Sequence, residues 1–142
     1  MKTFFPTQKE IKEIWYIIDA KGHTIGEIAS NAATLLRGKN QATYSPHLDP
    51  KQHVVVINAK EIRVTGNKLS GKIYRHHTGF MGGIKSTSLE EMLEKNPTQT
   101  IELAVKGMLP LNKWRVTLQN RLHVYGGTDH THSAQQPVAY KL

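Results

Sequence analysis

The segment Ile73–Ser86, with the sequence IYRHHTGFMGGIKS, concentrates side chains that could do chemistry. It contains two adjacent histidines, an arginine, a lysine and three glycines, and it contains no acidic residue. Histidines can bind a metal ion or transfer a proton, and glycines beside cations can hold a phosphate. The segment alone therefore permits a metal or catalytic site, a nucleotide site, or a surface that binds a nucleic-acid backbone.

A metal site would draw on the histidines. His76 and His77 are neighbours on a predicted strand, so their side chains point to opposite faces, whereas His130 and His132 are two apart and share a face. Asp129 could join the second pair. The sequence has no His-Glu-x-x-His helix and no second carboxylate cluster. The favoured interpretation is therefore that these histidines are hydrogen-bonding surface groups in basic regions.

Nucleotide binding and nucleophilic catalysis find little support. Gly22 and Gly26 lie between a predicted strand and a predicted helix, where a pyrophosphate would bind in a doubly wound fold. They do not form a Gly-x-Gly-x-x-Gly pattern, and no Gly-Lys-Ser/Thr occurs. Cysteine is absent, as is the Gly-x-Ser-x-Gly pattern of serine nucleophiles. We predict no cofactor and no small-molecule substrate; a small metal- or nucleotide-dependent α/β enzyme remains the alternative.

The distribution of charge favours a nucleic-acid partner. The 142-residue chain has 19 Lys and Arg against 11 Asp and Glu, a net charge of +8. Regions 62–89 and 103–142 carry five basic residues each, with Asp129 as their single acid. Such regions neutralise phosphates, and the interleaved glycines, tyrosines and histidines suit folded RNA more than duplex DNA. No apolar run could span a bilayer and no signal-peptide core is visible, so we expect a soluble intracellular protein without a membrane partner.

The elements that would position these residues begin with a βαβ unit. Trp15–Ala20 and His53–Ala59 are apolar, β-favouring runs that are typical of buried strands. Between them, Thr24 and Glu27 have the spacing of a capping box at a helix start, and Gly38 suits the helix end. Two strands joined by a crossover helix should be parallel.

The second half of the chain predicts three helices and a last strand. Capping signals place helix starts after Ser88 and Asn96, and a third helix begins near Trp114. This third helix leads into the sequence LHVYGG, residues 122–127, which we expect to be the last strand.

We expect a single α/β domain, residues 1–142, with a core over about 15–126. Residues 66–86 contain turn signals at Gly66-Asn67 and Ser70-Gly71, and residues 127–142 show no periodicity. These two segments are predicted to be a basic RNA-binding arm and an extended C-terminal tail. Both contain too little apolar sequence to bury themselves, so RNA should supply the order that they lack.

Six motifs in a fixed order make the chain similar to a known family. They are LLRGKNQATYSPH, VTGNK, YRHHTGFMGGIK, AVKGMLP, VYGG and DHTHSAQQP. Together they resemble the L-thirteen family of large-subunit ribosomal proteins, in its bacterial or organellar form, from about Trp15 to Pro137. The resemblance implies a three-layer α/β/α fold around a mostly parallel sheet of about four strands, and it implies no enzymatic activity.

The resemblance also implies a function and partners. A member of this family would be a structural constituent of the large ribosomal subunit that binds large-subunit (23S-type) ribosomal RNA, adjoins other large-subunit proteins and supports subunit assembly. It would lie in cytoplasmic ribosomes, or in those of a plastid or mitochondrion. We expect RNA contacts from the matching motifs and from the basic residues of the segment 111–123, which departs from the family pattern. These residues are Arg37, Lys39, Tyr44, His47, Asn67, Lys68, Lys72, Arg75, His76, His77, Thr78, Gly82, Gly83, Lys85, Lys106, Gly107, Lys113, Arg115, Arg121, His123, Tyr125, His130, His132, Gln135 and Gln136.

Overall fold

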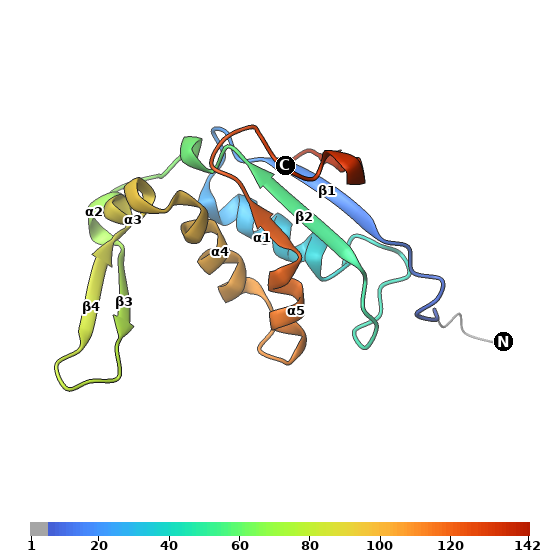
Figure 1. The fold of residues 1–142 in the computed structure, drawn as a ribbon, viewed down its shortest axis with the longest axis horizontal. Helices are drawn as coiled ribbons and strands as arrows, with labels where there is room; N and C mark the ends of the chain where they lie inside the picture. The colour runs from blue at the N-terminus through green and yellow to red at the C-terminus, as the bar shows by residue number, and fades with distance from the viewer. Residues whose placement is uncertain (1–5) are drawn as a thin grey trace.

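Two sheets and a set of short helices make up the computed structural model, which describes residues 6–142 (Figure 1). Residues 1–5, part of the N-terminal stretch in which we found no signal-peptide core, lie outside the described residues. The strands are β1 (Ile14–Asp19), β2 (Gln52–Ile57), β3 (Ile73–His77), β4 (Ile84–Ser88), β5 (Leu122–Val124) and β6 (Val138–Tyr140). The helices are α1 (Ile25–Leu36), α2 (Lys68–Gly71), α3 (Leu89–Lys95), α4 (Pro97–Met108) and α5 (Trp114–Asn120), with short 3₁₀ helices η1 (Ala59–Glu61) and η2 (Ser133–Gln135).

The main sheet is parallel throughout and has the strand order β5-β2-β1-β6. β1 and β2 pair in register from Ile14 opposite Gln52 to Asp19 opposite Ile57, and α1 is the crossover between them. The predicted parallel βαβ unit is therefore confirmed. The α/β class and the mostly parallel sheet of four strands are confirmed as well.

Helix α1 begins and ends where its capping residues predict. The Thr24 hydroxyl accepts the Glu27 backbone N–H at 3.3 Å, and the Glu27 carboxylate accepts the Thr24 backbone N–H at 3.0 Å. Gly38 follows the helix with a φ of +76°, and a Cβ there would lie 2.5 Å from the Pro50 Cβ. Glycine is needed at this position for its backbone angle and also for the close approach of the chain to Pro50.

One apolar core lies between the main sheet and the helices α1, α4 and α5. Every second residue of the central strands points into it, including Ile18, Val54 and Val56, because side chains alternate across a strand. Ile101 and Val105 of α4 close the core against α1. Helices thus cover one face of the sheet, and the layer on the other face is thin: it contains the tail segment around His132.

Two local expectations need correction. The strand at residues 122–127 is not the last, because Val138–Tyr140 forms β6 and pairs parallel with β1. Pairing at a sheet edge uses backbone groups, so it needs no apolar periodicity in the tail. Residues 68–71 form one helical turn where the sequence predicted only turns.

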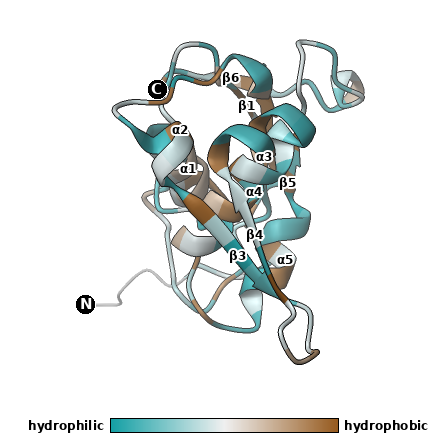
Figure 2. Ribbon diagram, turned by 90° about the vertical axis from the view of Figure 1, so that its left-hand side faces the viewer, coloured by the Kyte–Doolittle hydropathy of each residue, from teal (hydrophilic) through white to brown (hydrophobic). Residues whose placement is uncertain are grey.

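The predicted arm is a hairpin that stands away from the main sheet. β3 and β4 pair antiparallel, and they join the body through α2 and α3 (Figure 1). Figure 2 shows the hairpin projecting from the helices, with apolar colour at its tip. No residue of β3 or β4 belongs to the core cluster. The side chains of the hairpin are therefore not needed to build the core and can contact a partner.

Candidate nucleic-acid interface

The hairpin carries basic and hydrogen-bonding side chains on both of its faces. His76 pairs with Lys85 and Arg75 pairs with Ser86 across the two strands. Since residues directly opposite each other share a face, His76 and Lys85 lie on one face, and Arg75 and His77 on the other. All four are exposed, and no Asp or Glu occurs between residues 62 and 89. Such a hairpin presents positive charge to both sides at once.

The hairpin is fastened at its base. The backbone N–H of Leu89 donates to the Lys72 carbonyl at 2.9 Å, and the side chain of Leu89 is buried beneath it. The Lys72 ammonium lies 5.0 Å from the ring centroid of Tyr74, a cation–π contact that orients this lysine. Asn67, just before α2, accepts a hydrogen bond from Ser70. The base thus holds cations at defined positions.

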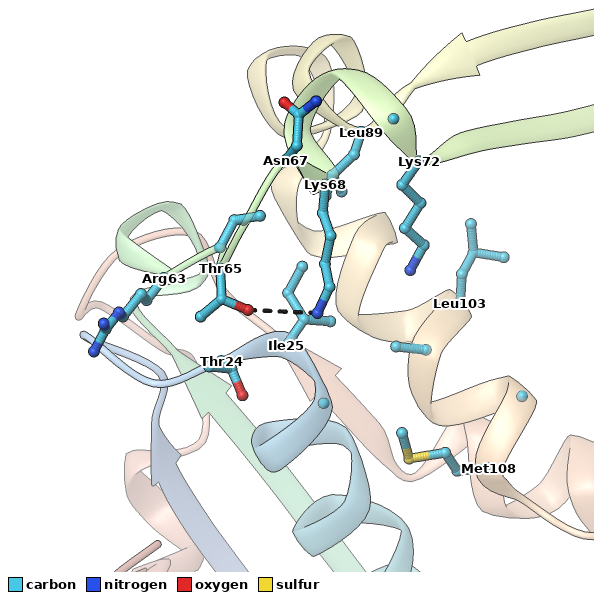
Figure 3. A pocket seen from close by; sticks show the side chains of 15 residues that line it. Thr24, Ile25, Arg63, Thr65, Asn67, Lys68, Lys72, Leu89, Leu103 and Met108 are labelled. Atoms are coloured by element: carbon cyan, nitrogen blue, oxygen red, sulfur yellow. Dashed lines mark hydrogen bonds between the residues drawn. The ribbon is translucent and has the colours of Figure 1, made fainter.

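A groove of about 730 Å³ opens where the hairpin base meets the body. Its floor is apolar and includes Ile25 of α1 and Leu103 and Met108 of α4, with Gly107 beside them. Lys68 and Lys72 reach across its opening, and the Lys68 ammonium donates to the Thr65 hydroxyl at 3.4 Å (Figure 3). None of the described residues that line the groove is acidic. The groove is therefore suited to an anion-bearing partner with an apolar part.

Further cations lie at the end of α4 and in the segment after it. Lys106 is exposed on the last turn of α4, and its carbonyl accepts two hydrogen bonds from the Arg115 guanidinium, at 2.7 and 3.0 Å. Lys113 is exposed at the start of α5. Gly107, which follows Lys106, lines the groove together with Asn67 and Lys68, so the predicted residues of α4 lie near those of the hairpin base.

Other predicted RNA-binding residues lie elsewhere on the molecule. Arg37 and Tyr44 line a small depression beside Pro50 and Trp114, and Lys39 and His47 belong to the same loop after α1. Arg121 forms an ion pair with Asp49 of that loop, and its side chain is only 15% exposed. The pair lowers the pKa of the Asp49 carboxyl, through the hydrogen bond from Arg121, and raises the pKa of Arg121. The charge of Arg121 is therefore already neutralised inside the protein.

His123 and His132 form a ring cluster on the second face of the main sheet. The His123 ring is stacked with Trp15 at 5.5 Å and lies 4.3 Å from His132. The His53 ring is nearly parallel to His123, with centroids 6.2 Å apart. Burial lowers the pKa of His123, and the neighbouring histidines lower it further. The hydroxyls of Tyr125 and Thr131 are hydrogen-bonded at 2.9 Å, and the Tyr125 ring lies 6.4 Å from that of His130. Gln135 and Gln136, further along the tail, are exposed.

Sequence reasoning missed some members of these sites. Arg63 and Thr65 line the groove, and the acid-free run 62–89 was the signal that could have found them. Trp15 and His53 belong to the ring cluster, but no sequence spacing connects them with His132. Among residues 6–142, no three His, Asp or Glu side chains are placed to hold a metal ion together. None of the helices in the described part of the chain is long and apolar enough to cross a membrane.

Comparison with known proteins gives consistent matches over the whole chain. The family model for ribosomal protein L13 matches residues 13–131. A protein of Psychromonas ingrahamii named large ribosomal subunit protein uL13 is 51% identical over 137 residues, which cover 96% of each chain. Proteins of the same name from Nitrosococcus oceani and Aliivibrio salmonicida are each 50% identical, over 142 and 137 residues. These relatives carry the name of a ribosomal protein and not of an enzyme. The chain belongs to the ribosomal protein L13 family.

Proposed function

We propose that this chain is a structural constituent of the large ribosomal subunit, where it binds large-subunit ribosomal RNA and supports subunit assembly. The names and the full-length similarity of its relatives support this role. The single observation that carries the RNA partner is the hairpin with cations on both faces and no acid. A hairpin of this kind is stabilised by anions on two sides, which a folded RNA offers and a flat acidic protein surface does not.

The hairpin, its base and the groove form the main RNA surface in this proposal. Lys68, Lys72, Arg75 and Lys85 neutralise phosphates, and the exposed His76, His77 and Thr78 donate or accept hydrogen bonds. Asn67, Gly82, Gly83, Lys106, Gly107, Lys113 and Arg115 complete this surface. A second contact region comprises Arg37, Lys39, Tyr44 and His47, and a third comprises Tyr125, His130, Gln135 and Gln136. Arg121, His123 and His132 act by holding the domain together, because their side chains are committed to Asp49 and Trp15.

The partners in this proposal are large-subunit ribosomal RNA and the proteins next to it in the subunit. The ribosome of the cytoplasm is the proposed location, which the bacterial relatives support. A plastid or mitochondrial ribosome is the other setting that the sequence suggested.

The salt dependence of binding tests the proposal. If roughly six to ten phosphates are contacted, affinity for deproteinised large-subunit ribosomal RNA should fall by orders of magnitude between about 50 and 200 mM salt. An affinity that does not change with salt would contradict the phosphate contacts. The enzyme alternative makes a different forecast, namely a stoichiometric metal ion or nucleotide in the purified protein. The chain should also co-sediment with large subunits from its own cells, and its absence from them would refute the structural role.

A further inference from the structure

Two large apolar side chains lie at the tip of the basic hairpin. Phe80 is 78% exposed, and Met81 is fully exposed. Single exposed apolar residues are common on protein surfaces, so exposure alone carries no function. The two residues are notable because they are adjacent and because they occupy the end of a projecting arm whose strands carry Arg75 and Lys85 (Figure 2).

The loop that presents Phe80 and Met81 is held by its own hydrogen bonds. The Thr78 N–H donates to the Gly83 carbonyl, and the Gly83 N–H donates to the Phe80 carbonyl, both at 2.9 Å. These two bonds close a turn around Phe80 and Met81. A Cβ on Gly83 would lie 2.0 Å from the Thr78 hydroxyl and 2.8 Å from the Phe80 carbonyl, so only glycine fits. Glycine at position 83 therefore lets the turn close, and the closed turn presents Phe80 and Met81 together at the end of the hairpin.

The charges of the hairpin strands indicate which kind of partner lies at the tip. Arg75 and His77 lie on one face of the hairpin, and His76 and Lys85 on the other, so the whole shaft favours a polyanion. When the strands bind this polyanion, a side chain at the tip of the hairpin lies in contact with it too. The flat apolar surfaces that an RNA offers are its bases, and unpaired bases stack on aromatic rings.

We propose that the tip of the hairpin is a base-stacking contact, in which Phe80 stacks on an unpaired base of large-subunit ribosomal RNA and Met81 packs beside it. The inference rests on the proposed function. It adds to the phosphate contacts a stacking contact that involves no charged side chain. Lysine and arginine contacts release counterions and weaken as salt rises, whereas stacking does not depend on counterion release. The tip should therefore contribute affinity that persists at high salt.

The test measures binding of the full chain to deproteinised large-subunit ribosomal RNA at several salt concentrations. Phe80→Ala should reduce affinity by about tenfold or more at every salt concentration and leave the slope against salt unchanged. Phe80→Trp should retain the affinity, because indole stacks at least as well as phenyl. The control Val116→Ala removes an apolar side chain that is also exposed, on α5, and should leave binding as it was.

The outcomes separate this inference from the proposed function. If the unaltered chain does not bind the RNA, both are overturned. If it binds with the expected salt dependence but Phe80→Ala binds equally well, the stacking contact is overturned and the phosphate contacts stand. If Phe80→Ala binds the RNA normally but no longer enters large subunits, the tip docks on a neighbouring protein, and the stacking contact is again overturned.

Discussion

The imidazole of His53 lies flat against the indole of Trp15, with ring centroids 4.1 Å apart and planes inclined by 10°. The two residues are direct neighbours across the parallel pair β1–β2. His123 of β5 is also stacked on Trp15, and the ring of His132 in the tail lies against Trp15 at a tilt of 35°. The second face of the sheet is therefore covered by rings and by the tail, whereas the first face is covered by helices.

Stability should fall as this ring cluster is protonated. Burial lowers the pKa values of His53 and His123 below 6.5, although the Glu13 carboxylate, 3.4 Å from His53, acts in the opposite direction. The unfolded chain therefore takes up protons first as the pH falls, and stability present above pH 6.5 is lost as the pH falls through the folded pKa values. We expect the melting temperature to drop as the pH falls below about 6.5.

The variant His123→Phe is the matched control for this pH dependence. Phenylalanine keeps a flat ring next to Trp15 and His132 but cannot be protonated. The drop in melting temperature over the same pH range should therefore be smaller in the variant. An equal drop in both proteins would assign the pH dependence to His53, whose pKa burial also lowers and which the variant keeps.

The Asp49–Arg121 pair should stabilise the domain. It ties the loop after α1 to the start of β5, and both side chains are largely buried. Arg121→Ala leaves the Asp49 carboxylate without its charged partner and should cost roughly 2–3 kcal/mol in the free energy of unfolding. Lys113→Ala, in which an exposed cation is removed, should cost almost nothing. Denaturant unfolding of both variants measures the difference, and equal stability would contradict a structural role for Arg121.

The capping box of α1 should be worth a measurable part of the stability. Thr24→Ala removes the hydroxyl that accepts the Glu27 N–H, and should lower the free energy of unfolding by about 1 kcal/mol. Thr24→Ser keeps the hydroxyl and should remain near the original stability. Chemical denaturation is the measurement, and a loss in the serine variant as large as in the alanine variant would indicate that packing, not capping, matters at this position.

Removal of hairpin cations should weaken RNA binding without unfolding the protein. Arg75 and Lys85 are exposed on opposite faces of the hairpin and have no part in the core. The double variant Arg75→Ala/Lys85→Ala should bind large-subunit ribosomal RNA more weakly and reduce the salt slope by about 2, while the melting temperature stays within a few degrees. A sharply lower melting temperature with intact RNA binding would make these residues structural.

Free in solution, the hairpin should be the least protected part of the described chain. A two-stranded hairpin without a packed face is marginally stable, whereas α1 is capped and buried in the core. Amide hydrogens of residues 73–88 should exchange faster than those of α1. Proteases should cut within residues 73–88 first. Val138–Tyr140 should be intermediate because β6 is bonded to β1. Protection of the hairpin equal to that of α1 would contradict this expectation.

The sequence by itself determined the βαβ core and the family. Capping residues, glycine positions and apolar runs act over a few residues, so Thr24, Glu27 and Gly38 predicted the bounds of α1 correctly. The acid-free run from residue 62 to residue 89 likewise marked the basic arm, because charge composition is visible without any fold. All of these signals act between residues that are close together in the chain and therefore also close together in space.

Only the tertiary structure decided which distant residues meet. Arg121 counted as a free cation in the sequence, yet it lies against Asp49, 72 positions away. His132 joins Trp15 and His53 because the tail returns along β1 as β6, and parallel pairing of this kind depends on backbone bonds that leave no pattern in side-chain types. The faces of the hairpin were likewise set by its register, since a shift of one residue between the strands would bring Lys85 to the same face as Arg75.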